Sequence, residues 1–226
     1  MSAGRIVLLV FGCLVLLMGL GLTIAGGTAL WANVALKDDE GYLTTKTLQI
    51  NKTSYAVVSE PAEIHVGSFW GWDLGDLVSF KVEGSNNNST KDIFIGVAAQ
   101  SDINTYLNDV EYDEIIGFHI NPDELEYQHH PGNSTPAAPI TETFWEPAVN
   151  GSGWQTLKWN LESGTWVLAL MNADGSQGVN VSVIFGAKVP WLFPMGLGFV
   201  IGGVVALVAG PLMIFYAVRS PRGPTS

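Results

Sequence analysis

The stretch VPWLFPMGLGFVIGGVVALVAGPLMIFYAV, residues 189–218, decides how the rest of this chain is organised. Its thirty residues carry no charged side chain. A helix rises about 1.5 Å per residue, so this length is enough to cross a hydrocarbon core about 30 Å thick. The stretch therefore predicts a transmembrane helix, and it guides the interpretation of the first apolar stretch.

Residues 6–36 form a second run, of 31 residues, without a charged side chain. A cleavable signal peptide is the competing interpretation, because ALWA before Asn33 has the form of a cleavage site. The apolar core of a signal peptide has about 7–15 residues, and this run is about twice as long. We therefore expect two uncleaved spans, tails at residues 1–5 and 219–226, and one domain at residues 37–188.

Positive charge predicts the orientation of the two spans. Arg5 precedes the first run, and Arg219 and Arg222 follow the second. Because cytoplasmic flanks are rich in Lys and Arg, we expect both termini in the cytoplasm and the domain outside the plasma membrane. Trp31 and Trp191 then fall at the same outer interface, where amphipathic rings anchor helices.

Glycines recur every seven residues in both spans. This spacing keeps a position on one face of a slightly supercoiled helix, and small residues let helices approach closely in lipid. We expect an antiparallel hairpin, and Gly198 with Gly202 offers a second face for a homo-oligomer or another membrane protein. The alternative is that glycine is simply common in membrane helices. The repeating positions are Gly12, Gly19, Gly26, Gly196, Gly203 and Gly210.

The charges of the chain are concentrated between the two spans. All 21 acidic residues lie there with seven lysines, which gives a formal net charge of −14. This charge excludes nucleic acid and anionic headgroups as partners and is typical of a solvated surface or a high-salt habitat. The single cysteine, Cys13, lies in the first span, so no intramolecular disulfide can form.

Short runs rich in β-branched and aromatic residues, separated by Gly, Asn, Asp, Ser and Pro, predict strands throughout the domain. We also expect one short helix over residues 101–110, capped by Ser101. This pattern predicts a mainly β fold, an antiparallel β-sandwich of Ig-like or jelly-roll type, flanked by the two helices. The expected strands are 48–50, 54–59, 62–66, 77–83, 93–98, 115–119, 124–128, 153–159, 165–172 and 178–184.

Alternation indicates which faces of two strands are buried. Val78, Phe80 and Val82 alternate with Ser79 and Lys81, as in a half-buried strand. In the same way, valines at 179, 181 and 183 alternate with polar residues. Residues 166–170 are apolar without interruption, which predicts a fully buried central strand.

Six N-x-S/T sequons lie in the domain, where composition alone gives about 1.7 by chance. They predict N-glycosylation of an extracytoplasmic domain. The alternative is a surface that is merely rich in Asn, Ser and Thr. The candidate residues are Asn51, Asn87, Asn88, Asn133, Asn150 and Asn180.

His129 and His130 are the candidate metal ligands, with Asp123, Glu124 and Glu126 nearby. Adjacent residues on a strand point to opposite faces, so the two histidines can share an ion only if a turn intervenes. A polar strand end is the simpler interpretation. We expect no metal, no cofactor and no catalytic residues, because no nucleophile or metalloprotease motif is present.

Two further stretches suggest ligands. NADGS, residues 172–176, resembles part of a calcium loop but lacks the flanking carboxylates, so a hairpin turn is the simpler expectation. Trp70 and Trp72 lie in the Gly-rich stretch SFWGWDLGD. Their indole faces are the best candidates for stacking on a glycan or entering a membrane surface. Trp145, Trp154 and Trp159 are further candidates for a glycan platform, although core packing explains most of these tryptophans more simply.

The chain resembles a family of membrane-anchored proteins, common in actinobacteria, that have one outer domain between two transmembrane helices. The resemblance implies this architecture and no activity, cofactor or site residues. The Asn-rich residues 85–90 and the sequons differ from actinobacterial members and indicate an archaeal version. The resemblance rests on ALWANVALKDDEGYLTT (29–45), FIGVAAQSDINTYL (94–107), YQHHPGNSTPAAP (127–139), WVLALMNADGSQGVNV (166–181) and GAKVPWL (186–192).

These observations favour a non-enzymatic surface protein that is anchored in the bilayer by two spans. Its acidic domain is expected to bind a partner protein, envelope polymer, glycan or other ligand, or to serve the architecture of the envelope. One alternative is an accessory subunit that packs through its glycine faces. The other is a hydrolase in which His129 or His130 acts with nearby carboxylates.

Overall fold

The computed structural model describes residues 3–65, 68–69, 72–73, 78–120 and 123–219. The chain forms two compact units. One consists of Met1–Lys37 with Pro190–Ser226 and holds the two long helices; the other is the β domain, Asp38–Val189.

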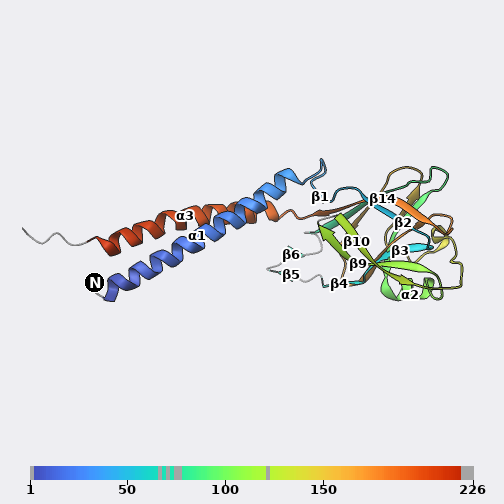
Figure 1. Cartoon of the computed structure of the whole chain (residues 1–226), viewed down its shortest axis with the longest axis horizontal. Helices are drawn as coiled ribbons and strands as arrows, with labels where there is room; N and C mark the ends of the chain where they lie inside the picture. Colours follow the sequence, from blue (N-terminus) through green and yellow to red (C-terminus); the bar gives the residue numbers. More distant parts are fainter. Residues whose placement is uncertain (1–2, 66–67, 70–71, 74–77, 121–122, 220–226) are drawn as a thin grey trace, which may run out of the picture. The chain divides into compact units, whose positions relative to one another are not determined.

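The β domain contains two large sheets (Figure 1). In the first, β14 pairs with β7, β1 and β2, and β12 pairs with the other edge of β7. All of these pairs are antiparallel. The strands of this sheet are β1 (Leu43–Thr44), β2 (Leu48–Lys52), β7 (Ser79–Asn86), β12 (Gln155–Asn160) and β14 (Val179–Lys188).

The second sheet has the order β10-β9-β3-β13-β8-β11, with β4 also paired to β13. Strands β3 and β9 run parallel, so the sheet is mixed and the expectation of a purely antiparallel fold is corrected. Its strands are β3 (Ala56–Ser59), β4 (Ala62–Ile64), β8 (Ile93–Ala99), β9 (Tyr112–Ile120), β10 (Asp123–His130), β11 (Ala148–Gly151) and β13 (Gly164–Asn172). A separate two-stranded pair is formed by β5 (Ser68–Phe69) and β6 (Trp72–Asp73).

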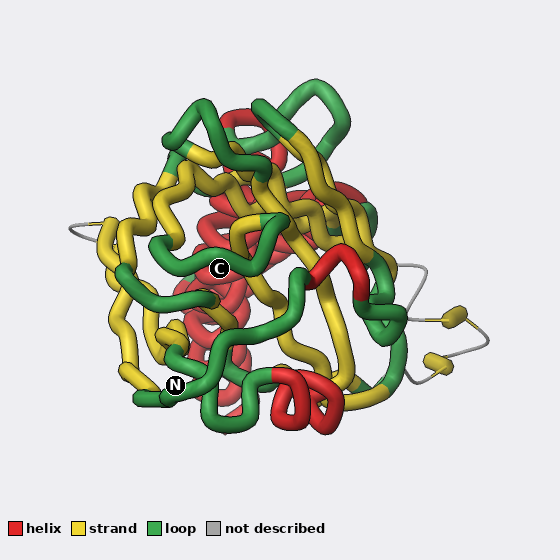
Figure 2. Tube along the Cα trace, turned by 90° about the vertical axis from the view of Figure 1, so that its right-hand side faces the viewer, coloured by secondary structure: helices red, strands yellow, loops and turns green. Residues whose placement is uncertain are grey.

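The two large sheets share one apolar core, and the strands lie in layers around it (Figure 2). Ile50 and Val181 of the first sheet belong to the same buried cluster as Ile95 and Leu170 of the second. The valines at 179, 181 and 183 are fully buried, which confirms the face predicted from their alternation. The domain is therefore mostly β, with a sandwich-like arrangement of two sheets.

A second core covers the other face of the seven-stranded sheet. Here Phe94 and Met171 pack with Ile103 and Leu107. Ile103 lies in the short helix α2 (Gln100–Tyr106), and Leu107 directly follows it. The predicted helix exists, but Ala99 is its N-cap, so the cap assigned to Ser101 was wrong. A 3-10 turn, η2 (Pro139–Thr141), lies in the loop before β11.

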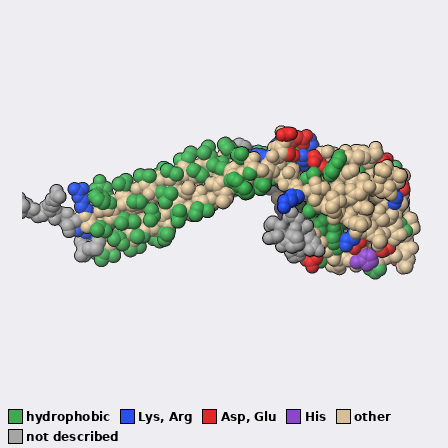
Figure 3. All heavy atoms as spheres, turned by 45° about the horizontal axis from the view of Figure 1, so that its top comes forward, with side chains coloured by type: hydrophobic (Ala, Val, Ile, Leu, Met, Phe, Trp, Pro, Cys, Tyr) green, Lys and Arg blue, Asp and Glu red, His purple; other side chains and the backbone are tan. Residues whose placement is uncertain are grey.

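The helix unit consists of α1 (Ala3–Ala35) and α3 (Leu192–Val218), which lie side by side. Both are long and apolar enough to cross a membrane. Large apolar side chains cover their outer surface (Figure 3), as a lipid environment requires. Cys13 is exposed among them.

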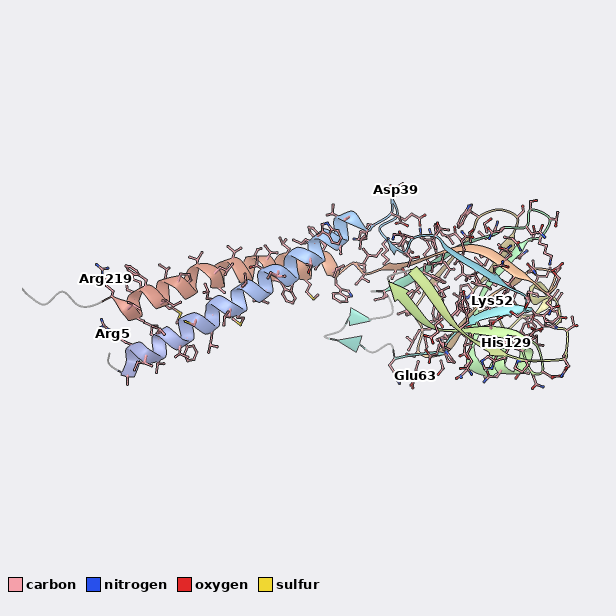
Figure 4. All side chains as sticks on the ribbon, viewed as in Figure 1. Arg5, Asp39, Lys52, Glu63, His129 and Arg219 are labelled. Carbon is pink, nitrogen blue, oxygen red and sulfur yellow. The ribbon has the colours of Figure 1, made fainter. Side chains whose placement is uncertain are left out.

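The repeating glycines lie on the faces where α1 and α3 meet. A Cβ atom built on Gly19 would stand 2.9 Å from the carbonyl oxygen of Gly203, and one built on Gly26 would stand 2.6 Å from that of Gly196. At the end of the pair that holds Arg5 and Arg219, an Arg5 guanidinium nitrogen donates to the Arg219 carbonyl oxygen at 2.6 Å (Figure 4). The two backbones therefore approach as closely as glycine allows.

Candidate functional site

An apolar pocket of about 440 Å³ opens where the shared core ends between the two sheets. It is lined from both sheets by residues of β3, β4, β7, β8, β12, β13 and β14 and by Leu161, which follows β12. Such a volume lies within the range of about 300–1,000 Å³ that is common for ligand sites. The described side chains that line it include Ile64, Phe80, Val97, Leu157, Trp159, Leu161, Trp166, Leu168 and Phe185.

Strand register places these side chains opposite one another. On the first sheet, Phe80 pairs with Trp159, while Val82 pairs with both Leu157 and Phe185. Alternate residues of a strand share a face, so Phe80 and Val82 both point toward the inter-sheet space. Phe80 is nevertheless 41% exposed, because the core stops short of it and leaves the pocket open.

Two tryptophans form one wall of the pocket. Trp159 and Trp166 meet edge to face, with ring centroids 5.4 Å apart. The Trp166 indole nitrogen donates to the Glu162 carbonyl oxygen at 3.0 Å, so its hydrogen-bonding capacity is used. What the Trp166 ring offers to the pocket is therefore apolar and aromatic surface.

The polar groups at the pocket wall are already engaged within the domain. Ser59 Oγ accepts a hydrogen bond from the Leu168 amide at 3.0 Å. The Lys81 ammonium bonds to Asp38 and, at 2.9 Å, to Glu83. Ser59 and Lys81 thus have partners within the domain, and most of the described lining is apolar. The arrangement suits an apolar ligand.

Lys81 itself is 4% exposed, which corrects the expectation that this position of β7 faces solvent. The turn that contains Asp38, Glu40 and Tyr42 covers it, and the Tyr42 ring centroid lies 5.0 Å from its ammonium. Burial lowers the pKa of Lys81, but its hydrogen bonds to Asp38 and Glu83 outweigh burial and raise it. Burial likewise raises the pKa of Asp38, and the bonds from Lys81 and the Tyr42 amide reverse this and lower it.

The two histidines of β10 make separate contacts. His129 Nδ1 lies 3.4 Å from Asp113, whereas His130 Nε2 lies 2.8 Å from Glu114. The His130 ring also stacks on Tyr112, with centroids 4.3 Å apart. His129 is half exposed in the region where Lys52 also lies near Asp113 (Figure 4).

No metal-binding cluster of three or more His, Cys, Asp or Glu side chains occurs in the part of the chain that the structure describes. His130 lines an open polar depression of about 310 Å³ with Tyr112 and Asp109, in which the described lining includes no serine, threonine or cysteine nucleophile. The side chains of Asp123 and Glu124 lie outside the described residues.

NADGS forms a turn, but the expectation of a hairpin was wrong. It connects β13 to β14, which belong to different sheets. Asp174 accepts hydrogen bonds from the Ser176 hydroxyl and amide, and these bonds lower its pKa. Asn172 is fully buried and donates to the carbonyl oxygens of Ser176 and Gly178. Its polar atoms stabilise the crossing between sheets.

Of the aromatic candidates, Trp70 and the side chain of Trp72 lie outside the described residues. Trp154 is 55% exposed, whereas Trp145 packs on Phe94 in the second core. Trp159 and Trp166 line the pocket. Trp159 was one of the tryptophans considered from sequence for stacking on a glycan, whereas Trp166 was expected only as part of a buried strand. Their separation by only seven residues in an aromatic-rich segment was the available signal.

Five of the six sequon asparagines are exposed and Asn180 is half-buried. Asn87 Nδ2 donates to Gln49 at 3.1 Å and to Asn180 Oδ1 at 2.8 Å. Asn88 differs, because its Oδ1 accepts from the Thr90 amide and hydroxyl, and its Nδ2 makes no hydrogen bond to another described residue. Asn87 and Asn88 therefore differ in whether the side-chain nitrogen that would carry a glycan is already hydrogen-bonded.

No model of a known protein family matches the sequence, and no curated protein sequence matches it either.

Proposed function

We propose that this chain is a membrane-anchored binding protein whose β domain takes an apolar ligand into the pocket between its sheets. The two helices cross the plasma membrane with both termini in the cytoplasm, and the domain, a sandwich of Ig-like or jelly-roll type, lies outside. Arg5 and Arg219, at one end of the helix pair, support this orientation through the positive-inside rule.

The observation that carries the proposal is an open pocket with an almost wholly apolar wall. Exposing Phe80, Trp159 and Phe185 to water costs free energy that a bound apolar group would recover, at about 25 cal/mol per Å² of surface covered. A domain selected only for stability would gain by closing such a space with larger side chains. An open pocket of this kind is the default site for a ligand.

Photolabelling of the purified full chain in nanodiscs tests the proposal. A small phenyl diazirine, which is apolar and uncharged, should label peptides that contain Trp159, Trp166 or Phe185. Leu161→Asp places a charge at the half-buried rim, after β12, and should reduce this labelling about tenfold. Trp154→Asp, at an exposed position outside the pocket, is the matched control and should leave labelling unchanged. Equal labelling in all three proteins would contradict the proposal.

A second candidate function is supported by the helix unit. Cβ atoms built on Gly198 and Gly202 would meet no described atom within 4 Å, so this face of α3 is not used by α1. A third helix, from a second copy or another membrane protein, would cover this face.

The sequons support glycosylation as a further property of an outer domain, and we expect Asn88 to be the preferred site of the overlapping pair. A glycan on Asn87 would replace one of the two Nδ2 hydrogens that it donates to Gln49 and Asn180, and so would break at least one of these bonds. Asn88 Nδ2 makes no such bond to a described residue and can carry a glycan without this loss. Glycopeptide mass spectrometry after expression in a host that glycosylates asparagine measures occupancy. Thr90→Ala removes the Asn88 sequon alone; a glycan on Asn87 in the unaltered protein would contradict the expectation.

A further inference from the structure

We infer that the pocket between the sheets takes the single acyl chain of an amphiphile whose headgroup is uncharged or zwitterionic. This inference rests on the proposed function and specifies its ligand. Three observations carry it: the chemistry of the wall, the size of the pocket, and the charge of the domain around it.

The wall selects against polar groups inside the pocket. The Ser59 hydroxyl and Lys81 ammonium are bound within the domain, and the Trp166 indole nitrogen donates to Glu162. A ligand hydroxyl, amide or charge placed there would lose bonds to water, and a wall that is almost wholly apolar replaces few of them. The part of the ligand that enters is therefore mainly hydrocarbon, and a charged or strongly polar headgroup stays at the mouth.

The pocket is large enough to hold one acyl chain. Its volume is about 440 Å³. A methylene group is close in size to a water molecule, which takes about 30 Å³ in the liquid, so there is room for roughly fifteen carbons. In the proposed bilayer, hydrocarbon chains of lipids would lie beside the two apolar helices of the same protein, so chains of this kind are available to the domain.

Charge then selects the headgroup. The segment between α1 and α3 carries a formal net charge of −14. Near the pocket, Glu63 and Glu162 directly neighbour the lining residues Ile64 and Leu161 in sequence. Both glutamates are exposed. An anionic headgroup at this mouth would be repelled, whereas an uncharged or zwitterionic one would not.

The test uses monoacylglycerols of about six to eighteen carbons to compete with the phenyl diazirine in the full chain. Each added methylene should strengthen protection of the Trp159 and Trp166 peptides about fourfold, until the pocket fills at roughly fifteen carbons. Labelling of α1 and α3 peptides in the same sample reports how much of each monoacylglycerol partitions into lipid. Protection of these helix peptides should show no change in slope at about fifteen carbons. A lysophosphatidylglycerol of matched length should protect less, and added salt should narrow the difference.

Two results would overturn the inference while leaving the proposed function intact. In the first, the diazirine labels the pocket but no monoacylglycerol protects it. In the second, protection shows no dependence on chain length beyond that of the helix peptides. Stronger protection by the anionic amphiphile would overturn the headgroup assignment. If labelling appears only after Trp70→Ala and Trp72→Ala, the occupant is part of this chain and both the inference and the proposed function fail.

Discussion

Replacing Gly19 with leucine is expected to force α1 and α3 apart and to cost about 3 kcal/mol of hairpin stability. A Cβ atom at this position would stand 2.9 Å from the carbonyl oxygen of Gly203 and the amide nitrogen of Leu207. Both are backbone atoms, so no side-chain rotation can relieve the overlap. In lipid, close packing is the main attraction between helices, and a wider separation forfeits it along the whole interface.

Electron spin resonance measures this separation directly. Spin labels at Leu17→Cys and Val205→Cys, both on lipid-facing positions and in a Cys13→Ser background, report the distance between the helices. Gly19→Leu should lengthen and broaden the distance distribution. An unchanged distribution would show that the glycine contact does not hold the helix pair together.

Gly198→Leu is the matched control, because the space around Gly198 is open. It should leave the distance between α1 and α3 unchanged. The same variant separates the two candidate functions, since it fills the face that a third helix would use. If Gly198→Leu abolishes an oligomer or a complex seen with the unaltered chain, the accessory-subunit function gains support. If no complex is affected, that function loses its basis.

Sequence periodicity correctly predicted which face of a single strand or helix is buried. The valines at 179, 181 and 183 alternate because one face of β14 is the core. The glycines repeat every seven residues because one face of each helix meets the other. In both cases the pattern lies within a single segment, where a residue's neighbours in space follow from its neighbours in sequence.

Features that join distant segments could not be predicted in this way. The alternation at Phe80 and Val82 indicated the correct inner face, but nothing local shows that the core ends before Phe80. The pocket exists because Trp166 and Leu168 of one sheet face Phe80 and Phe185 of the other, and the strand order that brings them together is not encoded in spacing. β13 and β14 likewise enter different sheets across a turn that has the composition of a hairpin.

Lys81 is the clearest example, because two of its partners, Asp38 and Glu40, lie more than forty residues earlier in the chain. On a strand that alternates, a lysine between Phe80 and Val82 predicts a solvent-facing position. The turn at Asp38 and Glu40 instead folds over it and supplies the countercharge, together with Glu83. Burial of this lysine follows from the tertiary arrangement, and its consequences for stability are large enough to measure.

Lys81→Met is expected to lower the free energy of unfolding of the β domain by about 3 kcal/mol, because it leaves Asp38 and Glu83 clustered without their cation. Asp38 and Glu83 retain partial contact with water, which keeps the loss at the lower end of the range for buried pairs. For a domain of this size the midpoint of thermal unfolding should fall by roughly 6–12 °C. Lys158→Met removes an exposed ion pair with Glu40, which water and salt screen, and should leave the midpoint of thermal unfolding nearly unchanged.

The pH dependence of this loss identifies its electrostatic origin. The pKa of Asp38 is lowered in the folded domain, so its contribution is present above its unfolded value of about 3.9 and is lost as pH falls further. The pKa of Lys81 is raised, so its contribution is complete below about pH 10 and is lost only as pH rises through the higher folded value. The stability difference between the unaltered chain and Lys81→Met should therefore be constant from about pH 5 to 9 and shrink below about pH 4.

Neutralising the carboxylates that have lost their cation distinguishes two causes of the stability loss in Lys81→Met, uncompensated charge and lost packing. If uncompensated charge causes the loss, Asp38→Asn and Glu83→Gln added to Lys81→Met should restore more than half of the lost stability, because methionine fills much of the space of the lysine stem. If the triple variant is no more stable than Lys81→Met, the loss comes from packing or from the fold of the covering turn. In that case the difference at acid pH should also fail to shrink, so the two measurements must agree.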